Sequence, residues 1–139
     1  RQQLRGALAQ AGGGEGSVVA LLGEAGIGKT RLVGELIGTA EDRGARVLVG
    51  RSCESEQVLP FGPWVDALRA GGLVRDERAL ARLEPAWRAE LGRLLPELAG
   101  GDLPSPTEDA RRIFESTTRL LEAASAAAPL VVLLEDAHW

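Results

Sequence analysis

The sequence predicts an α/β fold with a parallel sheet, and two observations lead to this prediction. The first is an apolar run at residues 17–22, followed by a segment with helical apolar spacing at 29–43 and a second short run at 46–50. A strand, helix, strand unit of this length requires a parallel crossover. The second is another apolar run at residues 130–134, which ends directly in two acids. Continuous hydrophobic runs of this kind are typical of strands buried on both faces of a sheet.

The remaining elements are expected to be helical. Residues 4–11 form a candidate short helix, and the segment at about 52–95 has no strand pattern, which predicts a helical insertion. A loop-like composition follows at 96–106. Ser105 has the features of a helix cap, with Pro106 at the first helical position and Glu108 three residues after the cap. We expect that helix to end before Pro129.

The buried face of this last helix is predicted from its apolar spacing. The residues expected to face the core are Ala110, Ile113, Phe114, Thr117, Leu121 and Ala124.

The composition limits the classes of partner. The chain has 139 residues, 45% of them hydrophobic, and a net charge of −4. A mildly acidic chain with scattered basic residues lacks the electrostatic footprint of a nucleic-acid-binding surface, so we expect no direct nucleic-acid contact. The most apolar run is shorter than the ~20 residues that a membrane span needs. A cytoplasmic location without membrane contact is the expectation, and the single cysteine agrees with a reducing compartment.

The segment GEAGIGKT at residues 23–30 has the spacing of a phosphate-binding loop. Three glycines allow the backbone to wrap closely around a polyphosphate, and the start of the following helix directs N–H groups and a positive dipole end toward it. Lys29, which is the only lysine in the chain, would contact the β- and γ-phosphates, and the Thr30 hydroxyl would bind Mg²⁺. The predicted binding set is Gly23, Glu24, Ala25, Gly26, Ile27, Gly28, Lys29, Thr30 and Arg31.

The strand at 130–136 ends in Glu135 and Asp136. Alone, an acidic strand end is a weak signal, but together with an upstream phosphate loop it predicts a metal and water site. Ligands of open α/β sheets bind at the carboxyl ends of the strands. The fold expected from both motifs is a P-loop NTPase three-layer sandwich.

At this point the chain resembles a known family. GEAGIGKTRLVGEL, VLVGRSCESE, PFGPWVDAL, RRIFESTTRLL and LVVLLEDAHW together are similar to the AAA-type ATPase domain of large bacterial signalling regulators of the STAND class, such as LuxR-family transcriptional regulators. The resemblance implies ATP with Mg²⁺ as ligands, and the choice of ATP over GTP rests on it. It also implies a metal-shell role for Glu135 and a water-orienting, catalytic role for Asp136. The family usually has Asp where this chain has Glu135, which leaves the division of roles open.

Other positions have two interpretations each. Arg51 and Glu54 follow the second predicted strand at the active-site edge, although a solvated loop explains them as well. Phe61, Pro63 and Trp64 are candidates for an adenine pocket or a partner surface, with core packing as the simpler interpretation. His138 is more simply a packed or capping residue than a γ-phosphate sensor.

Three functions remain open at the sequence level. The first is a slow signalling ATPase whose nucleotide state switches downstream domains of the same polypeptide, with nucleotide-dependent self-association. The second is a P-loop small-molecule kinase, and the third a nucleotide-binding scaffold without turnover. The resemblance further implies that a strand beyond residue 139 completes the sheet, so we expect a truncated domain with little turnover of its own.

Overall fold

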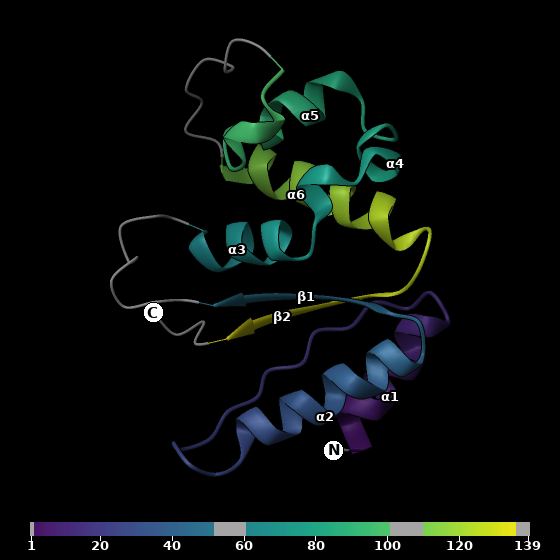
Figure 1. Ribbon diagram of the computed structural model, residues 1–139, viewed down its shortest axis with the longest axis vertical. Helices are drawn as coiled ribbons and strands as arrows, with labels where there is room; N and C mark the ends of the chain where they lie inside the picture. Colours follow the sequence, from purple (N-terminus) through teal and green to yellow (C-terminus); the bar gives the residue numbers. More distant parts are fainter. Residues whose placement is uncertain (1, 52–60, 101–109, 136–139) are drawn as a thin grey trace. The chain divides into compact units, whose positions relative to one another are not determined.

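The computed structural model describes residues 2–51, 61–100 and 110–135, which contain eight regular elements and two short 3₁₀ turns (Figure 1). In chain order they are α1 (Gln2–Gly12), α2 (Lys29–Asp42), β1 (Arg46–Arg51), α3 (Gly62–Ala70), η2 (Leu73–Arg75), α4 (Glu77–Leu80), α5 (Pro85–Leu91), η3 (Pro96–Leu98), α6 (Ala110–Ser125) and β2 (Leu130–Glu135).

The chain divides into two compact units. The N-terminal unit consists of Arg1–Val47 and Ala128–Val131, and the helical unit consists of Leu48–Ala127 and Val132–Trp139. Each unit therefore takes a part of both strands.

The sheet has two strands, β1 and β2, which are neighbours and run in the same direction (Figure 1). Where β2 begins, the amide of Arg46 donates a hydrogen bond of 2.8 Å to the carbonyl of Pro129. The predicted α/β class is confirmed. The two apolar runs at 46–50 and 130–134 are strands, as predicted. The three-layer sandwich stays a prediction.

The strand predicted at residues 17–22 is wrong. This segment has no regular secondary structure, and all six of its residues are exposed, with Val18 100% and Leu22 93% accessible. Among the described residues β2 pairs with β1 and not with this segment. An extended segment without a strand partner leaves its N–H and C=O groups to water, so its apolar side chains stay exposed as well. The expected crossover between 17–22 and β1 therefore does not form.

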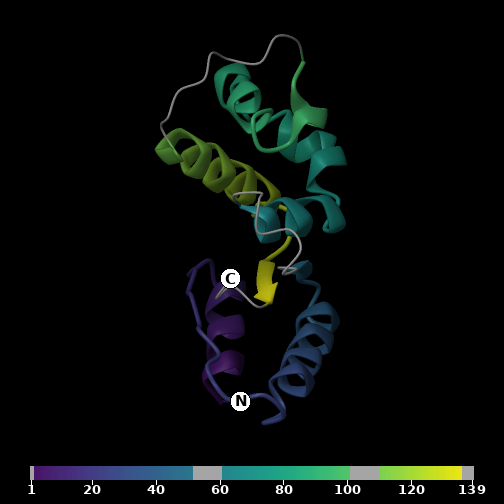
Figure 2. The same ribbon diagram turned by 90° about the vertical axis from the view of Figure 1, so that its left-hand side faces the viewer.

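The N-terminal unit is organised around α2. The helix ends at Asp42, and Gly44 follows with φ 75°, which matches the predicted stop. The apolar face of α2 packs with α1 and with the start of both strands (Figure 2). That small core contains Leu8, Ala40 and Ala45, surrounded by Leu36, Val47 and Val131.

In the helical unit, β1 and α3 approach closely. A Cβ atom added at Gly50 would overlap the backbone carbonyl of Pro63, and one added at Gly71 would overlap the side chain of Leu48. Leu48 itself is fully buried. Two glycines are therefore needed for α3 to cover the strand at this distance.

A second layer of the helical unit consists of α4, α5 and α6, in which α6 contacts both α4 and α5 (Figure 2). The carboxylate of Glu90 is 3% exposed and forms ion pairs with Arg93 at 3.1 Å and Arg112 at 3.3 Å. The guanidinium groups of Arg112 and Arg119 lie over the ring of Trp87, 5.7 and 4.6 Å from its centroid. Polar contacts thus supplement the leucine packing of this unit.

The buried face of α6 differs in part from the prediction. Thr117 and Ala124 are buried as expected, whereas Phe114 is exposed and Ser116 and Leu120 are buried in its place. Ser116 and Thr117 donate hydrogen bonds to the Ile113 carbonyl, which satisfies their hydroxyl groups inside the helix packing. The predicted cap residues Ser105, Pro106 and Glu108 lie outside the described residues.

No helix within the described part of the chain combines the length and the apolar character needed to cross a bilayer.

Candidate functional site

The phosphate loop at residues 23–30 adopts the backbone that its glycines allow. Gly26 and Gly28 have φ values of 82° and 94°, in the left-handed region that other residues rarely adopt. Gly28 is the residue that precedes α2, and no side chain caps the helix there. The first amides of a helix lack intrahelical partners, so the start of α2 offers N–H donors to an anion.

Lys29 folds over this loop. Its Nζ donates hydrogen bonds to the carbonyl oxygens of Gly23 at 2.5 Å and Glu24 at 2.9 Å. The ammonium group is therefore held at the loop by two neutral backbone acceptors, which a charged phosphate oxygen would outcompete.

The other residues of the predicted binding set surround this contact. Thr30 lies in the first turn of α2 and is exposed, and Ile27 is exposed at the tip of the loop. Arg31 forms an ion pair of 3.5 Å with Glu35, one turn further along the helix. All residues of the predicted binding set are exposed except Lys29, which is half-buried, and the role of the set stays a prediction.

The acidic strand end belongs to the helical unit. Glu135 is the last residue of β2, and Arg51 is the last residue of β1. Because the strands are parallel neighbours, their carboxyl ends meet at one edge, and Arg51 Nε lies 2.6 Å from Glu135 Oε2. The backbone amide of Arg51 donates to Asp66 Oδ2 at 3.1 Å. Asp136, the second predicted acid, lies outside the described residues.

Two contacts were not anticipated from the sequence. Arg51 is the last residue of β1 and not part of a loop; its side chain is solvated, at 71% exposed, and its guanidinium also binds Glu135. Its position at the end of one strand, matching that of Glu135 at the end of the other, is the signal that would have predicted the pair. Asp66 carried no such signal, because only the packing of α3 brings it to the end of β1. Glu54 and His138 lie outside the described residues.

The aromatic candidates near α3 show packing contacts. Phe61 meets Phe114 edge to face, with ring centroids 5.3 Å apart and planes at 89°. Trp64 and Pro63 lie half-buried in the first turn of α3. The ring contact links the start of α3 to α6, but none of these three aromatic and proline side chains is fully buried, so the core-packing interpretation stays a prediction.

One further ion pair in the helical unit shifts the pKa values of both of its members. The guanidinium of Arg69 binds Glu97 through two hydrogen bonds of 2.7 and 3.0 Å. The hydrogen bonds from Arg69 hold the pKa of the Glu97 carboxyl below its ordinary value of 4.5, and the same contact raises the pKa of Arg69.

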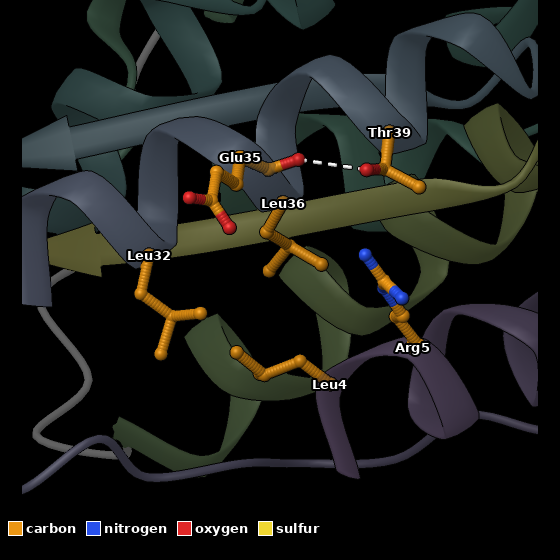
Figure 3. A pocket seen from close by; sticks show the side chains of 6 residues that line it. All are labelled: Leu4, Arg5, Leu32, Glu35, Leu36 and Thr39. Carbon is orange, nitrogen blue, oxygen red and sulfur yellow. Dashed lines mark hydrogen bonds between the residues drawn. The ribbon is translucent and has the colours of Figure 1, made fainter. Parts of the chain in front are cut away.

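A shallow recess lies between α1 and α2 (Figure 3). Thr39 Oγ1 donates to the Glu35 carbonyl at its edge, as drawn in Figure 3. None of its lining residues belongs to the predicted site; they are Leu4, Arg5, Leu32, Glu35, Leu36 and Thr39.

Residues 2–51, 61–100 and 110–135 contain no group of three His, Cys, Asp or Glu side chains that could hold a metal by themselves. Mg²⁺ usually binds through one or two carboxylates together with waters and substrate phosphates, which needs no such group. The hydroxyl of Thr30 and the carboxylate of Glu135 are oxygen donors of the kind that Mg²⁺ prefers. The donor chemistry therefore fits a metal that arrives with its nucleotide.

Comparison with known proteins identifies the family. The family model described as the AAA ATPase domain matches residues 1–139, which is the whole chain. The chain therefore belongs to the AAA ATPase domain family, whose members bind ATP with Mg²⁺. Neither curated proteins nor solved structures give a match.

Proposed function

We propose that this AAA ATPase domain binds ATP with Mg²⁺ through residues 23–31, hydrolyses it slowly, and acts as a nucleotide switch in a multidomain signalling or transcriptional regulator. The observation that carries the proposal is the loop itself. Two left-handed glycines open onto the start of α2, and the only lysine of the chain folds over the same loop.

Binding follows from an exchange of partners. In the structure the ammonium of Lys29 donates hydrogen bonds to the carbonyls of Gly23 and Glu24. A β- or γ-phosphate oxygen is a charged acceptor, and hydrogen bonds between two charged groups are about twice as strong as neutral ones. The ammonium would therefore turn from the loop carbonyls to the phosphate, while the first amides of α2 contact the same anion.

The metal and the water have separate residues in this proposal. Thr30 and Glu135 would hold Mg²⁺, which neutralises the charge that develops on the phosphates. Asp136 would orient the attacking water. Glu135 is one methylene group longer than the Asp that the family usually has at this position. The two acids would have exchanged roles if loss of the Glu135 carboxylate, and not of the Asp136 carboxylate, stopped turnover.

The main test is Lys29→Ala. We expect ATP binding to weaken by about 3 kcal/mol, more than a hundredfold in Kd, because two or more charge-assisted contacts are lost. The measurement is a titration with a fluorescent ATP analogue, checked by circular dichroism for an unchanged fold.

Arg43→Ala is the matched control, since it removes a positive charge from the other end of α2, where Arg43 is exposed. It should leave Kd within about twofold, since exposed charges at this distance are screened. A Lys29→Ala protein that binds ATP within about threefold of the parent would contradict the proposed site.

Phosphate release separates the switch from the two other functions. A signalling ATPase releases phosphate without an added acceptor, a small-molecule kinase needs one, and a scaffold releases none. The proposed partners are ATP, downstream domains of the same polypeptide and a second copy of the chain, whose association would depend on nucleotide.

A further inference from the structure

We draw no further inference here: the strongest candidate, the exposed apolar segment at residues 17–22 of the N-terminal unit with Val18 and Leu22 open to solvent, carries no proposal because nothing in the structure shows what covers it.

Discussion

Residues 17–22 and strand β1 flank the same helix, α2, and both are short runs of apolar residues, yet their surroundings differ. In β1 the side chain of Leu48 is fully buried, and the strand is paired with β2 and covered by α3. In the first run, Leu22 is 93% exposed, and no strand partner lies beside it among the described residues.

The difference shows what makes an apolar run a strand. Apolar side chains favour burial wherever a surface exists, but the backbone needs a second strand for its N–H and C=O groups. β1 obtains that strand from much later in the chain, since Arg51 at its end and Glu135 at the end of β2 are 84 positions apart. Among the described residues, the segment 17–22 has no such neighbour, and it leads instead into the loop that precedes Lys29.

The largest expected difference between the two runs is in the free energy of unfolding when one leucine of each run is changed to alanine. Leu48→Ala should lower the free energy of unfolding by about 2–5 kcal/mol, because it leaves a cavity between β1 and α3. Leu22→Ala should change it by less than about 0.5 kcal/mol, because the side chain is already in water. Urea denaturation followed by circular dichroism measures both. Similar losses in the two variants would mean that residues 17–22 are packed in solution.

A smaller effect tests the close approach of α3 to β1. Gly50→Ala places a Cβ onto the carbonyl of Pro63, and we expect a loss of about 1–3 kcal/mol from overpacking. Gly16→Ala is the matched change beside the first run, where no atom lies within 4 Å of the added Cβ. It should be neutral or stabilise by up to about 1 kcal/mol through the unfolded chain. The melting temperatures of the two variants should shift in different directions or by clearly different amounts. An unchanged melting temperature in Gly50→Ala would argue against the packing of α3 on β1.

The smallest effect concerns the ion pair that ties α3 to η3. The folded state holds the pKa of Glu97 below its ordinary value of 4.5, through the hydrogen bonds from Arg69. Stability from this pair is therefore present above that ordinary value and is lost as the pH falls through the lower folded pKa. Both side chains are well exposed, so solvent screening limits the contribution to less than about 1 kcal/mol.

Glu97→Gln should therefore lose this small contribution at neutral pH and show a weaker decrease of stability on acidification. Denaturation midpoints at a series of pH values measure the decrease. Glu115→Gln removes a carboxylate from another arginine pair, with Arg119, and leaves Glu97 intact, so it keeps the acid-dependent loss that Glu97 causes. Parallel pH curves for Glu97→Gln and the parent would contradict the assignment.

Several features of the fold and the site were predictable because their causes are local. The helix after the phosphate loop begins at Lys29 and stops before Gly44, as the spacing of its apolar residues and the glycine indicate. The runs at β1 and β2 are strands. The prediction for α6 was half right, since Phe114 is exposed and contacts the half-buried Phe61, while Ser116 is buried with its hydroxyl satisfied.

The sequence by itself determined where the phosphate loop, its lysine and the acidic strand end lie in the chain, because glycine backbone freedom, a single lysine and an apolar run ending in acids are properties of consecutive residues. Only the tertiary structure decided which apolar run is paired and which carboxylate the Arg51 backbone amide binds. Strand pairing joins β1 to β2 across a long stretch of chain, and the packing of α3 at Gly50 brings Asp66 to the Arg51 amide. Contacts of this kind depend on which surfaces meet, and no local pattern of residues contains that information.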